Sequence, residues 1–219
     1  PILTVKDLVI ATSNESKKLT LVDNLSFELL PSEILSIVGE SGSGKSITAK
    51  SILGLLPKNF SVSGEIKYYE KNLIQADEKA MLSVRGHEIG LVFQEPMTAL
   101  NPVLSIGEQL TESMIISGKV NSKIAHERAL EMLNRVGIPH PKERMEQFPH
   151  EFSGGMRQRI LIAMMMLMEP NILIADEPTT ALDVTIQAQI LDLLSALVQE
   201  EKMSMILITH DMGVVAQTA

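Results

Sequence analysis

The sequence predicts a mixed α/β fold that carries an inserted, all-helical segment, and three observations support this prediction. A glycine-rich loop at residues 39–46 follows the apolar run 34–38 and precedes a helix-like stretch at 47–56, which makes a strand–loop–helix unit. Between residues 106 and 168 glycine and proline thin out, and apolar residues recur at helical spacing. Short segments of strand type occur at residues 2–10, 25–30, 64–69, 89–93, 172–175 and 205–208.

The order of these segments divides the chain into a core and an insertion. The runs 34–38 and 205–208 are almost wholly apolar, which is typical of strands buried on both faces of a central sheet. Residues 184–199 have the spacing of an amphipathic helix. We therefore expect one core, built from residues 1–97 and 169–219, and a helical subdomain built from residues 98–168.

Composition excludes several classes of protein. The net charge of −8 argues against a nucleic-acid binder, whose surface should be basic. The absence of cysteine excludes disulfides, thiolate metal sites and cysteine nucleophiles. The longest apolar run, around residues 160–168, is far shorter than the roughly 20 residues of a membrane span, so we expect a soluble, intracellular segment. Because the sequence starts with Pro1 and stops at Ala219 within a helical pattern, we also expect a fragment of a longer chain.

The glycine-rich loop matches the pattern G-x-x-x-x-G-K-[ST], which binds the phosphates of nucleoside triphosphates. Its glycines let backbone N–H groups gather around phosphate oxygens, and the following helix adds its positive N-terminus. Lys45 can reach the outer phosphates, and the Ser46 hydroxyl is placed to ligate Mg²⁺. The predicted cofactor-binding residues of the loop are Gly39, Glu40, Ser41, Gly42, Ser43, Gly44, Lys45, Ser46 and the adjacent Ile47.

Two carboxylates follow the apolar run 172–175. Ligands of such sheets bind at the carboxyl ends of the strands, where Asp176 and Glu177 would lie. Asp176 would hold Mg²⁺, usually through water, and Glu177 would act as a general base toward an attacking water. Taken alone, the pair would more often be two acidic residues that cap a loop, and the glycine-rich loop turns the balance toward the functional interpretation.

A second anion site is predicted at Ser153, Gly154 and Gly155. Ser153 is a good helix N-cap, and backbone amides at a helix N-terminus bind anions. One chain does not need two phosphate sites for one nucleotide. The second site makes sense if it closes on a nucleotide held by a partner subunit. The arginines at positions 157 and 159 could clamp a phosphate or pair with surface acids, and the sequence leaves both open.

These motifs together resemble the ATP-binding cassette (ABC) ATPases over essentially the whole chain, in family order. Beyond the motifs above, the resemblance covers Gln94 of the Q-loop, Asp183 of the D-loop and the switch histidine His210. It implies a P-loop NTPase core of ABC type, with an N-terminal antiparallel β part and an inserted helical subdomain. Residues 94–102 and 178–191 look like the ATPase subunits of dipeptide, oligopeptide and nickel importers.

The resemblance also implies a role for each matched residue. Gln94 would sense the γ-phosphate and ligate Mg²⁺, and His210 would bond the γ-phosphate and orient water with Glu177, alongside Lys45. Asp183 would lie at a dimer interface. The serine and glycines of the second anion site would contact the partner's γ-phosphate.

The implied function is ATP hydrolysis, with ATP and Mg²⁺ as cofactors, in a subunit on the cytoplasmic side of a membrane. The implied partners are a second ATPase subunit, identical or related, the transmembrane permease subunits and, indirectly, a substrate-binding protein. Non-transport ABC ATPases, ordinary P-loop kinases or GTPases and a truncated, inactive nucleotide-binding module are the alternatives. The short insertion argues against the first, and the second anion site argues against the second.

The sequence departs from the family pattern at several positions. In the LSGGQ-type signature motif of the family, which corresponds to residues 152–156 here, Phe152 stands where leucine is usual and Met156 replaces the usual glutamine. No aromatic residue occurs between Pro1 and Val22, where the family places a ring that stacks on adenine, so Ile10 or a neighbour would have to serve by apolar contact. The strands and C-terminal extension usual in this subfamily do not follow His210.

Overall fold

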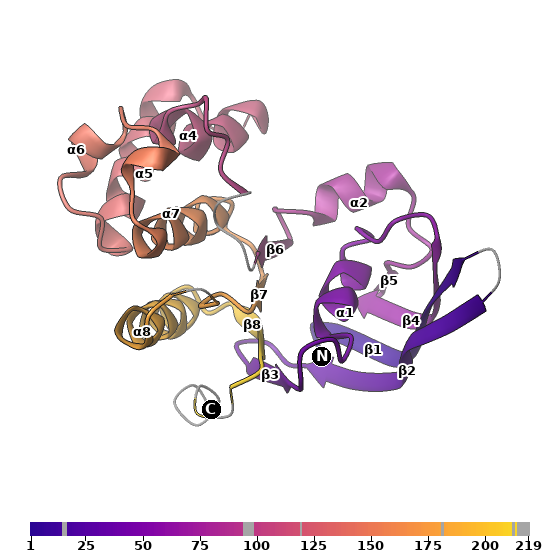
Figure 1. The fold of residues 1–219 in the computed structure, drawn as a ribbon. Coiled ribbons are helices and arrows are strands. Elements are labelled where there is room, and N and C mark those ends of the chain that lie inside the picture. The colour runs from indigo at the N-terminus through magenta and orange to yellow at the C-terminus, as the bar shows by residue number, and fades with distance from the viewer. Residues whose placement is uncertain (15–16, 94–98, 119, 181, 212, 214–219) are drawn as a thin grey trace.

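The computed structural model describes residues 1–14, 17–93, 99–118, 120–180, 182–211 and 213. These residues form two β-sheets and a group of helices (Figure 1). The predicted α/β fold with an antiparallel N-terminal part is confirmed.

An antiparallel sheet with strand order β2-β1-β4-β5 is built from the N-terminal part of the chain. Its strands are β1 (Leu3–Asn14), β2 (Lys17–Leu29), β4 (Phe60–Tyr68) and β5 (Lys71–Asn72). The sequence predicted a strand only at residues 25–30, which overlaps the end of β2, because the first half of β2 is rich in polar residues. That half is specified by pairing with β1, in which Ile10 lies opposite Val22.

A parallel sheet has the order β3-β8-β7-β6 and contains the four apolar runs that the sequence identified. Its strands are β3 (Ile34–Val38), β8 (Ser204–Thr209), β7 (Ile172–Asp176) and β6 (Ile89–Val92). Every residue of β6, β7 and β8 is buried, as expected for parallel strands covered on both faces. Asp176 pairs with Ile208, so β7 and β8 end together and deliver the residues that follow them to one edge.

The segment between β6 and β7 is helical where the structure describes it. It contains α4 (Ile106–Ile116), α5 (Ser122–Arg135), α6 (Pro141–Arg144), the 3-10 turn η1 (Pro149–Glu151) and α7 (Gly154–Met166). Polar N-caps start the longer helices, and Ser105 with Glu108 makes a capping box before α4. Figure 1 shows these helices as one group on the far side of the parallel sheet from the antiparallel sheet.

Two hydrophobic clusters fill the spaces on either side of the parallel sheet. Alternate residues of β7 point to opposite faces: Leu173 belongs to the cluster under the helices, and Ile174 to the cluster under the antiparallel sheet. The other helices among the described residues are α1 (Lys45–Ile52), α2 (Glu78–Val84) and α8 (Val184–Glu200). The parallel sheet therefore lies between two packed hydrophobic layers.

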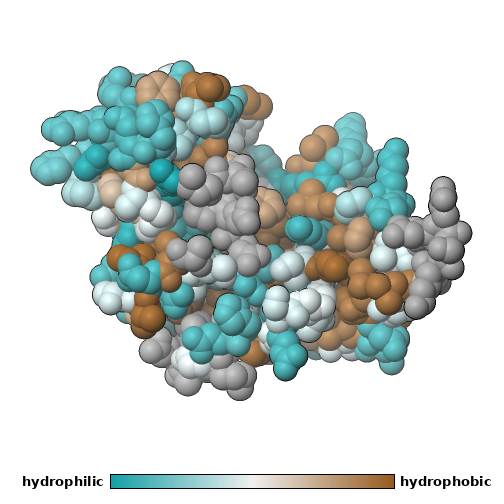
Figure 2. Space-filling model, viewed as in Figure 1, coloured by the Kyte–Doolittle hydropathy of each residue, from teal (hydrophilic) through white to brown (hydrophobic). Residues whose placement is uncertain are grey.

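The surface of the molecule is uneven in polarity. In Figure 2 hydrophilic residues cover much of the helical group, whereas hydrophobic residues gather over the antiparallel sheet. Within the described residues, no helix combines the length and the apolar character needed to cross a bilayer.

Candidate phosphate-binding site

The glycine-rich loop connects β3 to α1, as the sequence predicted. Gly42 and Gly44 have φ angles of 82° and 92°, a left-handed conformation that glycine adopts without strain. A Cβ on Gly44 would lie 2.9 Å from the carbonyl oxygen of Leu21 and 2.9 Å from Cγ2 of Val22. Glycine is therefore needed at Gly44 for two reasons, conformation and close approach to β2.

Lys45 points back into the loop at the start of α1. Its side chain is almost fully buried, and Nζ donates hydrogen bonds of 2.8 Å to the carbonyl oxygens of Gly39 and Glu40. The ammonium group also lies 3.9 Å from Oε1 of Glu177. A buried ammonium group held by neutral carbonyls can exchange them for the oxygens of an anion, so the geometry suits a phosphate ligand.

Ser46 and Asp176 meet beneath the loop. The Ser46 hydroxyl donates a 2.9 Å hydrogen bond to Oδ1 of Asp176, which is 5% exposed. Burial raises the pKa of the Asp176 carboxyl, against the hydrogen bond from Ser46, which favours the charged form. A hydroxyl beside a carboxylate is an oxygen pair of the kind that Mg²⁺ takes together with phosphate and water. Within the described part of the chain, no group of three or more His, Cys, Asp or Glu side chains is arranged to hold a metal ion.

Glu177 follows β7 in an unusual backbone conformation. Its φ angle is 47°, and its N–H donates to the carbonyl oxygen of Ile208 on β8. Oε2 accepts a 3.0 Å hydrogen bond from the Thr180 hydroxyl and lies 3.4 Å from Nδ1 of His210. A carboxylate fixed at this edge of the sheet, beside an ammonium group, is able to accept a proton from a bound water.

The remaining residues predicted for this site have simpler surroundings. Ile47 lies in α1 and packs on the cluster under the antiparallel sheet, and Ser43 N–H donates to the carbonyl oxygen of Glu40 within the loop. Glu40 and Ser41 are both exposed. Gln94 lies outside the described residues.

The residues of the predicted second anion site lie at the N-terminus of α7. The Ser153 hydroxyl accepts a hydrogen bond from the N–H of Met156, which makes Ser153 the N-cap that the sequence predicted. Together with Gly154, Gly155 and Asp183, it lines a cavity of about 540 Å³. Lys45 and Glu177 do not line this cavity. The predicted site residues thus fall into two groups on one chain.

Both arginines of α7 donate hydrogen bonds to carbonyl oxygens of the protein. Arg159 donates to the carbonyl oxygen of Val136 at the end of α5 and to Oε1 of Gln189 on α8. Arg157 donates from Nε to the carbonyl oxygen of Pro149. Arg159 thus connects α7 to the end of α5 and to α8.

Ile10 does not provide the apolar contact to a base. Its side chain is 0% exposed and packs within the cluster under the antiparallel sheet. Two further residues that the sequence did not single out contact this region: Thr180 bonds Glu177, and Gln187 bonds the carbonyl oxygens of Thr179 and Leu182. A hydroxyl residue three positions after a carboxylate was an available signal for Thr180, whereas no sequence pattern marks Gln187.

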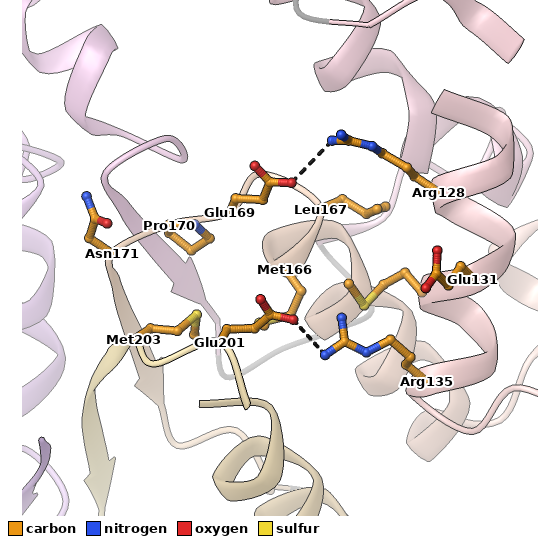
Figure 3. A pocket seen from close by; sticks show the side chains of 11 residues that line it. Arg128, Glu131, Arg135, Met166, Leu167, Glu169, Pro170, Asn171, Glu201 and Met203 are labelled. Atoms are coloured by element: carbon orange, nitrogen blue, oxygen red, sulfur yellow. Dashed lines mark hydrogen bonds and ion pairs between the residues drawn. The ribbon is translucent and has the colours of Figure 1, made fainter. Parts of the chain in front are cut away.

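A smaller cavity of about 340 Å³ lies apart from both groups, beside the residues that precede β7 (Figure 3). Ion pairs cross it from α5: Arg128 lies 3.2 Å from Glu169, and Arg135 lies 2.7 Å from Glu201. Its lining includes Met132, Met166 and Met203 between these charges. The pairs hold α5 against the ends of α7 and α8.

Comparison with known proteins gives consistent matches. The family model described as "ABC transporter" matches residues 22–180. The chain is 50% identical over 220 residues to the dipeptide transport ATP-binding protein DppD of Bacillus subtilis, covering 100% of this chain and 66% of that protein. It is also 50% identical to the oligopeptide transport ATP-binding protein OppD of the same organism, covering 100% and 62%.

Solved structures agree with this match. A structure described as a dimeric, post-hydrolysis state of the ATP-binding cassette MJ0796, bound to ADP and Pi, superposes with a TM-score of 0.84 at 28% identity, covering 97% of this chain and 89% of that one. The chain spans just under two thirds of the length of the two Bacillus subtilis relatives. Because the family model covers well over half of the chain, and the relatives match it from end to end, the chain belongs to the ABC transporter family.

Proposed function

We propose that this chain is the ATP-binding and ATP-hydrolysing part of an ABC importer for dipeptides or oligopeptides. The observation that carries the proposal is the convergence of Lys45, Ser46, Asp176, Glu177 and His210 on one edge of the parallel sheet. These residues come from three distant stretches of sequence. Their meeting supplies a cation, an oxygen pair for a metal and a carboxylate base around one loop.

Each side chain has a defined task in hydrolysis. The loop amides and Lys45 would bind the β- and γ-phosphates, and the nucleotide would displace the carbonyl contacts of the ammonium group. Ser46 and Asp176, with Gln94, would hold Mg²⁺, which when bound neutralises charge on the phosphates. Glu177 would take a proton from the attacking water, and His210 would orient that water.

The site is completed by a second subunit. Ser153, Gly154, Gly155 and Asp183 line a cavity that Lys45 does not reach, so on one chain they have no nucleotide to bind. In a head-to-tail pair, the N-terminus of α7 from one subunit would cover the γ-phosphate held by the other. The related cassette bound to ADP and Pi is described as dimeric, which supports this arrangement. The partner can be identical or a related ATPase.

The transport assignment follows from relatives named for dipeptide and oligopeptide transport, with nickel as the alternative cargo. The chain would sit at the cytoplasmic face of the membrane beneath permease subunits, with a substrate-binding protein acting from the other side. In this assembly, residues 98–168 would form the subdomain that contacts the permease, and residues 1–97 and 169–219 the ATP-binding core. Closing and reopening of the dimer would shift the permease between its states.

The test measures ATP binding and steady-state hydrolysis against protein concentration, with and without Mg²⁺. We compare the wild type with Glu177→Gln and with Glu127→Gln, the same change at an exposed position of α5. We expect the rate per chain to rise with concentration, and Glu177→Gln to bind ATP while hydrolysing it at least about 100-fold more slowly. A wild type that binds no ATP would refute the proposal.

A further inference from the structure

A threonine just after β7 holds the carboxylate of Glu177. The Thr180 hydroxyl donates a 3.0 Å hydrogen bond to Oε2, and the Thr180 N–H donates to the Glu177 carbonyl oxygen at 3.2 Å. The backbone bond closes a turn that keeps the hydroxyl beside the carboxylate. With Oε2 held in this way, Oε1 faces the ammonium group of Lys45 at 3.9 Å. A phosphate bound by Lys45 would therefore lie on the Oε1 side of the carboxylate.

The turn is itself fixed from α8. The side-chain amide of Gln187 donates hydrogen bonds of 3.2 Å to the carbonyl oxygen of Thr179 and 3.0 Å to that of Leu182. Gln187 lies in the first turn of α8, whose inner face includes the fully buried Ile190 and Leu194. The amide therefore ties the residues on either side of Thr180 to a helix that is anchored in the core.

His210 does not replace this restraint. Its Nδ1 lies 3.4 Å from Oε2, and its side chain is 59% exposed. The Thr180 hydroxyl lies closer to Oε2, at 3.0 Å, and is part-buried. Charge alone leaves a carboxylate free to rotate, whereas a hydroxyl and a fixed backbone define its direction.

We propose that Thr180 and Gln187 are positioning residues for hydrolysis: Gln187 fixes the turn, and Thr180 aims the Glu177 carboxylate at the attacking water. This inference rests on the proposed ATPase function. Neither side chain has to touch the nucleotide, because both act through Glu177. Small losses of alignment at a reacting group reduce rates by factors of about 10 to 100.

The experiment uses the full-length protein, purified with the subunits with which it assembles, and measures kcat and KM for ATP. Thr180→Val keeps the shape of the side chain and removes the hydroxyl, Thr180→Ser keeps the hydroxyl, and Gln187→Leu removes the two amide bonds. Thr4→Val makes the same chemical change at a half-buried position of β1, far along the chain from the site. The melting temperature of each variant is recorded alongside.

We expect Thr180→Val to lower kcat about 10-fold with KM changed less than about twofold, because ATP binding does not involve the hydroxyl. Thr180→Ser should recover kcat to within about twofold of the wild type, Gln187→Leu should show an intermediate loss, and Thr4→Val should show none. A wild type that does not hydrolyse ATP overturns the proposed function and this inference together. A wild type that is active, with Thr180→Val equally active or with Thr180→Ser as impaired as Thr180→Val, overturns the inference alone.

Discussion

Gly155 gives the sharpest stability prediction, because its neighbour across the cavity is a side chain that cannot easily move. A Cβ added to Gly155 would lie 2.7 Å from Cγ2 of Ile186, roughly 1 Å closer than an ordinary carbon–carbon contact of about 3.5–4.0 Å. Ile186 is β-branched and lies in α8, where one χ1 rotamer accounts for about 90% of cases. The contact is therefore relieved only if α7 and α8 move apart.

Gly154 provides the matched control one residue earlier in the same helix. Its added Cβ would meet Cδ2 of Leu182 at 3.4 Å, which is close to an ordinary contact with a flexible side chain. Replacing glycine by alanine in a helix gains at most about 1 kcal/mol. Overpacking costs about 1–3 kcal/mol. We thus expect Gly154→Ala to be neutral or stabilising, and Gly155→Ala to be about 1–3 kcal/mol less stable than Gly154→Ala.

Urea unfolding of both variants without nucleotide measures this difference, because no ligand contact enters the comparison. Thermal unfolding should show the same difference, because in a chain of this size 1 kcal/mol of stability corresponds to a change of about 2–4 °C in melting temperature. Removing the obstacle with Ile186→Ala should make Gly155→Ala less destabilising, with a coupling energy above about 0.5 kcal/mol. If Gly155→Ala proves as stable as Gly154→Ala, or the double variant shows no coupling, the steric reasoning is wrong.

Three further predictions concern burial, backbone conformation and ion pairs. Because burial raises the pKa of Asp176, the folded state binds that proton more tightly than the unfolded state, and stability is lost as pH rises through the acid range between the two pKa values. Asp176→Asn should therefore raise the melting temperature of the nucleotide-free protein at pH 7 and weaken Mg-ATP binding, while Asp192→Asn, an exposed control on α8, should do neither. Gly44→Ala should lower the free energy of unfolding in urea more than Gly42→Ala does. Alanine would be strained by the positive φ at either position, but a Cβ at position 42 meets no atom within 4 Å. Arg135→Ala should cost at most about 1 kcal/mol, and less in high salt, since its pairs with glutamates on the α8 side are partly exposed.

The residues proposed for the site could be picked out from the sequence because each motif is local. The glycine-rich loop needs left-handed glycines and a lysine at fixed spacing, and a buried strand that ends in Asp176 and Glu177 needs only adjacent residues. The buried parallel strands were equally plain, since burial on both faces leaves an unbroken apolar run. The first half of β2, by contrast, is polar and is specified by pairing with β1, which no local pattern records.

What the sequence could not supply is the way the fold restrains these residues. Lys45 and Glu177 are far apart in the chain, and their approach to 3.9 Å depends on β3 and β7 belonging to one sheet with β8 between them. The contacts of Gln187 have a different origin: its amide reaches two carbonyl oxygens only because α8 starts directly after the turn and packs firmly on the core. Residues that carry a charge or a nucleophile can be recognised in the sequence by their type and spacing. Residues that orient those side chains are of ordinary types, so their function can be inferred only from the geometry of the structure. If Thr180 and Gln187 prove to set kcat, the catalytic power of Glu177 will depend on a turn that the motif itself does not specify.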